Sequence, residues 1–89
     1  MIRQCIKIVN KLGLHARAAS KLVEITKSFS SEVNIVQDGT SVNGKSIMAL
    51  LILAAPLHST VEIVIDGPDE ADAMKAIIEL IENKFDEEE

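Results

Sequence analysis

Two residues near the start of the chain, His15 and Arg17, have the types and spacing of an anion site. They follow the turn-like stretch 10–13 and lie where the helical pattern of residues 16–29 begins. The first N–H groups of a helix have no partner within the helix, and the helix dipole favours negative charge there. We therefore expect the backbone N–H groups of Ala16, Arg17 and Ala18 to bind an anion, which the forked guanidinium of Arg17 can also reach.

A histidine beside such an anion site can do chemistry. Imidazole titrates near neutral pH and is a good nucleophile for a phosphoryl group. The anion donors would stabilise the resulting phosphohistidine. The alternative is a loop histidine beside an unrelated surface arginine, and the spacing of His15 and Arg17 alone leads no further than an anion site.

A second candidate site begins at Ser46, directly before the uncharged run 47–57. Serine is a favoured N-cap, so a short helix over 47–54 is expected. This helix is apolar on every side and cannot bury all of them against one sheet. The residues expected to face the core are Leu50, Leu53 and Ala54. The residues expected to be partly exposed, as a docking patch for a protein partner, are Ile47, Met48 and Leu51. A fully buried helix is the alternative.

Residues 39–46 also match the phosphate-binding loop G-x-x-x-x-G-K-[ST] of nucleotide hydrolases. We reject this interpretation because Asp38-Gly39 is a strong hairpin signal and 40–43 then forms a returning strand. Phosphate-loop folds also need a parallel sheet whose strands are apolar on both faces. The strands here are mostly apolar on one face, and 89 residues leave too few strands for such a sheet.

The elements that position these sites follow from hydrophobic periodicity. Strands are expected at 2–9, around Val33 and Ile35, at 40–43 and at 60–66. A last helix should begin with Asp69 as its N-cap. Its inner stripe should consist of Met74, Ile77, Ile78, Ile81 and Phe85. The order β-α-β-β-α-β-α with one-faced strands predicts an α+β two-layer sandwich, with an antiparallel or mixed sheet and helices on one side. A ferredoxin-like fold has the same element order.

Composition excludes several classes of protein. The chain has 89 residues, 47% of them hydrophobic and 26% charged, which predicts one globular domain over 1–89. A net charge of −5 and only two aromatic residues argue against a nucleic-acid binder. One cysteine excludes a disulfide framework and favours the cytoplasm, and no run is long enough to span a membrane. One Cys and two His also make structural zinc improbable. The acidic end, 86–89, is expected to be a solvated tail.

Three stretches resemble one known family. Gly13-Leu14-His15-Ala16-Arg17-Ala18-Ala19 resembles the active-site motif of HPr, the histidine-containing phosphocarrier of the phosphoenolpyruvate-dependent sugar phosphotransferase system. Residues 43–48 resemble the regulatory-serine segment of that family, and 66–70 resemble its entry into the last helix. The resemblance covers essentially the whole chain.

The resemblance implies a phosphoryl carrier. His15 would be phosphorylated on Nδ1 by enzyme I, with Arg17 as the assisting cation, and would pass the group to a histidine of an enzyme IIA-type acceptor. Ser46 would be a target of a kinase/phosphorylase. The implied fold is an open-faced β-sandwich with sheet order 1-4-2-3 and three helices on one face. We expect a monomer without independent turnover, without cofactor or metal, and with no nucleic-acid or membrane partner.

Two positions depart from the family pattern. Ala18 stands where the family usually has proline, and we expect the helix to persist because alanine is a good helix former. His58 stands where the family often has glycine before the last strand, so that turn is expected to need a left-handed residue. We assign His58 a structural or surface role and no catalytic one. A regulatory interaction module of the same fold, without sugar transport, remains the alternative function.

Overall fold

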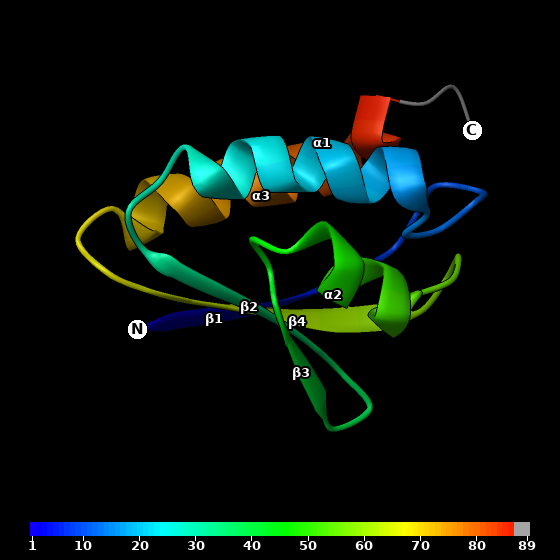
Figure 1. Cartoon of the computed structure of the whole chain (residues 1–89), viewed down its shortest axis with the longest axis horizontal. Coiled ribbons are helices and arrows are strands. Elements are labelled where there is room, and N and C mark those ends of the chain that lie inside the picture. Colours follow the sequence, from blue (N-terminus) through cyan, green and yellow to red (C-terminus); the bar gives the residue numbers. More distant parts are fainter. Residues whose placement is uncertain (87–89) are drawn as a thin grey trace.

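The computed structural model describes residues 1–86. Of the acidic tail predicted over 86–89, residues 87–89 lie outside the described residues. In chain order the elements are β1 (Ile2–Lys7), α1 (Ala16–Lys27), β2 (Glu32–Gln37), β3 (Thr40–Asn43), α2 (Ile47–Leu53), β4 (Thr60–Asp66) and α3 (Glu70–Glu82) (Figure 1). A short 3-10 turn, η1 (Lys84–Asp86), follows α3. The predicted element order is confirmed.

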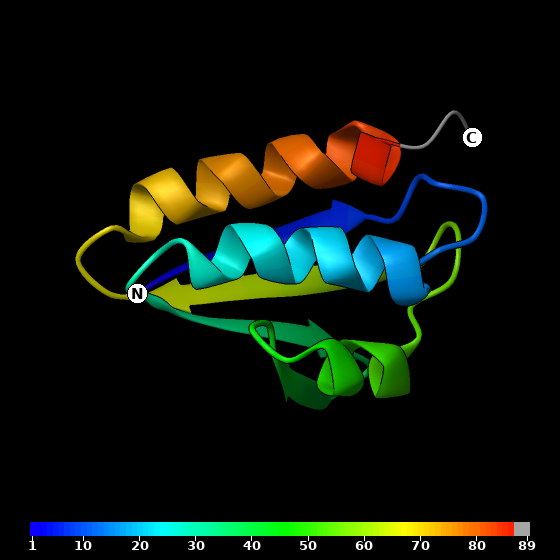
Figure 2. The same ribbon diagram turned by 45° about the horizontal axis from the view of Figure 1, so that its top comes forward.

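The four strands form one sheet in the order β1-β4-β2-β3, and each described neighbour pair is antiparallel. The register places Ile65 opposite both Ile2 and Val33. All three helices lie on one side of this sheet and leave its other face open (Figures 1 and 2). The fold is therefore the predicted open-faced sandwich, and its strand order excludes the ferredoxin-like alternative.

Strand alternation creates the core. Val61, Ile63 and Ile65 of β4 are buried beneath the helices, as are Val33 and Ile35 of β2. The rest of the core comes from the three helices. Their buried side chains include Leu22 of α1, Leu50 of α2, and Ile77 and Ile81 of α3. Burying such aliphatic side chains contributes about 1.5–3 kcal/mol each, so this layer contact stabilises the scaffold on which the loops rest.

The strand predicted over 2–9 ends earlier, at Lys7. Beyond it, Ile8 accepts a hydrogen bond from the His58 N–H (2.9 Å) and donates one to the Ser59 carbonyl (2.8 Å). Two consecutive residues, His58 and Ser59, thus lie opposite the single residue Ile8, which is the pattern of a β-bulge. The prediction that His58 occupies a left-handed position is confirmed by its φ of 74°.

The helix predicted over 16–29 ends at Lys27, because both hydrogen-bond donors of Ser28 bind a carbonyl of the last helical turn. The Ser28 hydroxyl donates to the Ile25 carbonyl over 2.6 Å, and its N–H donates to the same oxygen over 3.0 Å. Such local hydrogen bonds compete with continuation of the helix. The substitution of alanine for proline at position 18 leaves α1 intact, as expected.

Phe85 is fully buried, but it is not on the helical stripe to which the sequence pattern assigned it. The helix ends at Glu82, and Lys84, Phe85 and Asp86 all have positive φ, between 55° and 63°. This left-handed turn folds the phenyl ring back into the core. The Lys21 ammonium fixes the turn by donating to the Phe85 carbonyl over 3.0 Å.

Asp69 is the N-cap residue of α3, as predicted, but its side chain makes no capping hydrogen bond. Its carboxylate instead accepts hydrogen bonds from the N–H and hydroxyl groups of both Ser30 and Ser31. These bonds, the Ser31 hydroxyl above all, lower the pKa of Asp69 from 3.8 to about 2. Asp69 therefore joins the start of α3 to the loop between α1 and β2.

Candidate functional site

The loop that carries His15 is built around a buried turn at 10–13. The Gly13 N–H donates to the Asn10 carbonyl (3.1 Å), and the Asn10 side-chain amide donates to the Gly13 carbonyl (2.7 Å). Asn10 is completely buried. Because both hydrogen bonds join the two ends of the turn, the loop has a defined shape rather than a flexible one.

Gly13 is required for close approach of this loop to the loop after α2. Its φ is +65°, and a Cβ placed on it would lie 2.5 Å from the Ala55 carbonyl oxygen and 2.9 Å from Cα of Pro56. That same Ala55 oxygen accepts the Leu14 N–H over 2.8 Å. Leu14 is only 5% exposed, so the residue before His15 is anchored in the core.

His15 is the N-cap residue of α1, with extended φ and ψ of −94° and −177°. Its carbonyl accepts the Ala19 N–H over 2.8 Å, the first bond of the helix. Its half-buried imidazole provides no N-cap hydrogen bond within the described residues. Helix geometry leaves the N–H groups of Ala16, Arg17 and Ala18 at the helix terminus, in the turn that directly follows His15. These are the groups for which the sequence predicts an anion site.

Arg17 is exposed in the first turn of α1, and Ala16 before it is also exposed, whereas Ala18 is buried in the core. The first turn therefore has two accessible residues, Ala16 and Arg17, directly after His15, and the buried Ala18 anchors the turn in the core. The chain around it is cationic: residues 7–23 contain four lysine or arginine residues and no acidic residue, although the whole chain has a net charge of −5. This arrangement can hold a phosphate-sized anion next to an imidazole nucleophile.

Ser46 is the N-cap of α2, as predicted. Its hydroxyl oxygen accepts the Ala49 N–H over 3.2 Å, and its carbonyl accepts the Leu50 N–H over 3.1 Å. The residues before it are tied to the end of α1: the Thr26 hydroxyl donates to the Gly44 carbonyl (2.8 Å), and the Lys45 ammonium donates to the Phe29 carbonyl (2.9 Å). The serine is thus held at a fixed helix start.

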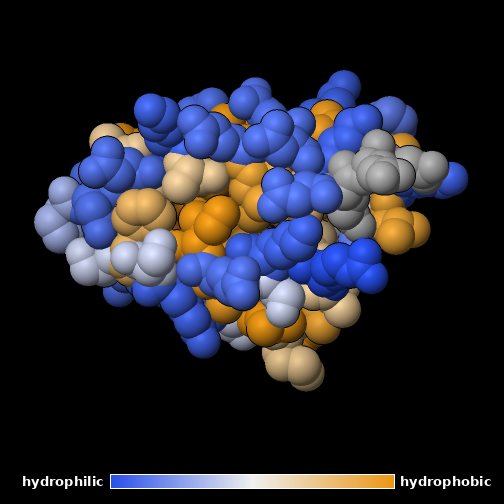
Figure 3. Space-filling view, turned by 90° about the horizontal axis from the view of Figure 1, so that it is seen from above, coloured by the Kyte–Doolittle hydropathy of each residue, from blue (hydrophilic) through white to orange (hydrophobic). Residues whose placement is uncertain are grey.

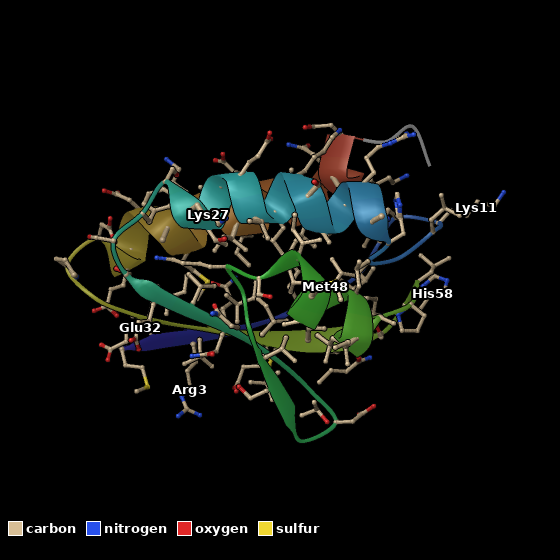
Figure 4. All side chains as sticks on the ribbon, in the orientation of Figure 1. Arg3, Lys11, Lys27, Glu32, Met48 and His58 are labelled. Carbon is tan, nitrogen blue, oxygen red and sulfur yellow. The ribbon has the colours of Figure 1, made fainter. Side chains whose placement is uncertain are left out.

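The helix after Ser46 divides into a buried and an exposed side, with one error in the prediction. Leu50 is fully buried and Leu53 half-buried, but Ala54 is exposed because it is the left-handed C-cap, with φ 50°. The expected docking patch is exposed: Ile47 is 39% and Met48 69% accessible, and Leu51 is partly covered. Figure 4 shows Met48 on α2, and the lower edge of Figure 3 shows apolar side chains gathered there.

Among the described residues, Met1, Val9, Leu12 and Ile52 are exposed apolar residues outside the predicted patch, and two of them are highly exposed near the sites described above. Ile52 is 77% accessible and lies one helical turn after Met48, so the i, i+4 spacing could have identified it. Leu12 is 68% accessible in the loop before His15. No periodic signal marks a residue in a loop, and only the turn geometry shows that it points outward.

The nucleotide-binding alternative is wrong. Gly39 is not in a phosphate-binding loop; it shares the β2–β3 hairpin turn with Asp38, and both have positive φ (82° and 49°). Residues 40–43 pair antiparallel with β2, and Gly44 packs on Val33, where a Cβ would come within 2.7 Å of a methyl carbon. The second glycine of the motif serves this packing contact.

Within residues 1–86, no group of three or more His, Cys, Asp or Glu side chains is arranged to hold a metal ion. None of the helices found there is long and apolar enough to cross a membrane.

Comparison with known proteins identifies the class. The family model described as "PTS HPr component phosphorylation site" matches residues 2–83. A phosphocarrier of the phosphotransferase system is thereby indicated. The chain belongs to the HPr family of phosphocarrier proteins.

Its relatives and structural neighbours agree over the full length. The chain is 48% identical to phosphocarrier protein HPr of Neisseria meningitidis over 100% of both chains, and 40% identical to phosphocarrier protein NPr of Escherichia coli over 98% of both. A crystal structure of HPr from Thermoanaerobacter tengcongensis superposes with a TM-score of 0.96 at 42% identity, covering 100% of each chain. The phosphocarrier role and the open-faced fold are therefore both shared with these proteins.

Proposed function

We propose that His15 is the phosphoacceptor of this phosphocarrier. The observation that carries the proposal is its position as the N-cap of α1, directly before the first-turn N–H groups of Ala16, Arg17 and Ala18. Enzyme I, charged from phosphoenolpyruvate, would be the donor. The Nδ1 atom attacks the phosphorus as the phosphorus–nitrogen bond to the donor histidine breaks, and a new phosphorus–nitrogen bond forms on His15.

Stabilisation of the moving group comes from fixed donors. The guanidinium of Arg17 and the amides of the first turn are directed toward the charge on the phosphoryl oxygens in the transition state. The downstream acceptor, an enzyme IIA-type protein, then takes the group onto its own histidine by the reverse exchange. The protein performs no independent turnover in this scheme, because each step needs a partner to supply or remove the phosphoryl group.

Phosphorylation of Ser46 by a kinase/phosphorylase is the proposed regulation. A phosphate there suits the N-terminus of α2 and adds about two negative charges. The exposed Ile47 and Met48 follow directly, so the charge enters the proposed docking patch. The segment before Ser46 is held by two hydrogen bonds, from Thr26 to the Gly44 carbonyl and from Lys45 to the Phe29 carbonyl. We therefore expect phosphorylation to weaken docking and not to unfold the protein.

A labelling experiment tests the carrier function. The protein and a His15→Ala variant are incubated with labelled phosphoenolpyruvate and enzyme I, and the label is tested for lability in acid and stability in base. We expect acid-labile label on the wild-type chain and none on the variant. Label that persists in His15→Ala contradicts the assignment of His15.

The alternative, a regulatory module without sugar transport, predicts no label while enzyme I phosphorylates another carrier. One observation favours keeping it in the test: a structural neighbour at 33% identity and TM-score 0.76 is Crh, described as the Bacillus subtilis catabolite repression protein. The single domain over 1–89, the cytoplasmic location and the monomeric state stay predictions. A related Thermoanaerobacter tengcongensis structure is described as an HPr dimer, so sedimentation should accompany the assay.

A further inference from the structure

Leu12 occupies a position that the fold does not explain. It lies with Lys11 at the centre of the turn closed by the hydrogen bond from the Gly13 N–H to the Asn10 carbonyl. Such positions usually hold glycine, proline or small polar residues. The Leu12 side chain is 68% exposed, so it contributes little to the core, while its neighbours Asn10 and Leu14 are buried.

The turn holds Leu12 in a fixed place. The side-chain amide of Asn10 and the N–H of Gly13 both bond across the turn, over 2.7 and 3.1 Å, and Gly13 packs against the loop after α2. Leu12 precedes His15 by three residues, so their Cα atoms are at most about 11 Å apart. A protein that brings its own reacting histidine onto His15 therefore comes within reach of Leu12.

The surroundings of Leu12 indicate what kind of surface fits there. Lys11 extends from the same tip, and Figure 4 shows it at the end of the molecule where α1 begins. The segment 7–23 has four lysine or arginine residues and no acidic residue of its own, and one of the four, Lys21, is paired with Asp86 over 3.9 Å. Later in the sequence than His15, α2 presents a separate apolar surface through Met48 and Ile52, which are 69% and 77% exposed.

We propose that Leu12 is a specificity-determining docking residue, which inserts into an apolar depression bordered by carboxylates on the protein that exchanges a phosphoryl group with His15. This inference rests on the proposed function and deepens it. The partner then contacts the chain on two separate apolar sites, the tip at Leu12 and the exposed side of α2. Two-point contact fixes the orientation of the partner over His15, which a single patch on a short helix does not.

Transfer kinetics test the proposal. The initial rate of label transfer from phosphoenolpyruvate-charged enzyme I is measured against carrier concentration for the wild type, Leu12→Asn and Leu12→Met. Asparagine suits the turn, whereas methionine keeps an apolar side chain of similar volume. We expect KM to rise about tenfold for Leu12→Asn with kcat unchanged, and to stay within about twofold of wild type for Leu12→Met. Val64→Thr, on the open sheet face, is the matched control and should leave both constants unchanged.

The outcomes separate this inference from the carrier function. An unchanged KM in Leu12→Asn, with His15→Ala still unlabelled, overturns the docking role and leaves the carrier function standing. Label on His15→Ala overturns the carrier function itself. A loss of kcat, or an equal loss in Leu12→Met, assigns Leu12 to the shape of the loop instead. For the carboxylate border, KM of the wild type must rise with salt from about 0.05 to 0.3 M, and a flat response refutes it.

Discussion

Replacing Gly13 by alanine should disturb the His15 loop more than any comparable change in a turn. The new Cβ meets the Ala55 carbonyl oxygen at 2.5 Å and Pro56 Cα at 2.9 Å, both of them backbone atoms that cannot rotate away. The left-handed φ of +65° costs an L-residue about 1–2 kcal/mol, and the forced contact adds about 1–3 kcal/mol. We expect a total loss of about 3 kcal/mol of unfolding free energy.

Gly39 provides the matched control, because it has the strain without the contact. Its φ is +82°, and nothing lies within 4 Å of the position of an added Cβ. Gly39→Ala should therefore cost only about 1 kcal/mol. Urea unfolding measures both variants, and the difference between them, about 2 kcal/mol, isolates the steric term.

The same pair of variants reports on the site. In Gly13→Ala the Ala55 carbonyl must move, and it is the acceptor for the Leu14 N–H directly before His15. We expect slower labelling of Gly13→Ala by charged enzyme I, and an unchanged rate for Gly39→Ala, whose hairpin is separate from the His15 loop. If Gly13→Ala is no less stable than Gly39→Ala, the close approach of the two loops does not position His15.

Three further predictions concern single side chains. Because the pKa of Asp69 is lowered to about 2, its contribution to stability is present above about pH 4 and lost as the pH falls through 2. Asp69→Asn should therefore be less stable than the wild type at pH 7, and the difference between the two should shrink as the pH falls to 2. A difference in urea midpoint that stays constant from pH 7 to 2 would contradict this prediction. Ser46→Ala removes the acceptor of the Ala49 N–H and should cost about 1 kcal/mol, which Ser46→Asn should largely restore. His58→Gly relieves a φ of +74° and should raise the unfolding free energy by about 0.5–1 kcal/mol, and a lower value would show that the imidazole makes a stabilising contact.

Local signals predicted the elements wherever one physical effect dominates. Strand β4 matches its prediction from Thr60 to Asp66 because its alternation is regular and it lies in the interior of the sheet. The Asp38-Gly39 hairpin and the Ser46 cap also depend only on neighbouring atoms. The place of His15 at the start of α1 was predictable in the same way, since a helix start and a glycine turn are both local features.

The errors arise where tertiary contacts decide. Asp69 has the sequence position of a cap, but two serines from another loop offer its carboxylate more donors than its own helix does. Phe85 continues the helical spacing, yet the core is reached better by a left-handed turn. Exposure of Leu12 and Ala54 depends on turn and C-cap geometry, which hydrophobicity alone does not encode.

The hydrogen bonds around α1 bear on how the proposed phosphoacceptor His15 and the proposed regulatory residue Ser46 influence one another. The helix begins directly after His15, its N-cap. Near its end Thr26 donates to the Gly44 carbonyl, and just beyond it the Phe29 carbonyl accepts from Lys45. Because both ends are fixed by hydrogen bonds to neighbouring loops, a new charge at Ser46 has no hinge through which to move His15. Its effect must pass through the surface that partners touch. Regulation at Ser46 is therefore expected to change the affinity of docking and not the intrinsic reactivity of the histidine.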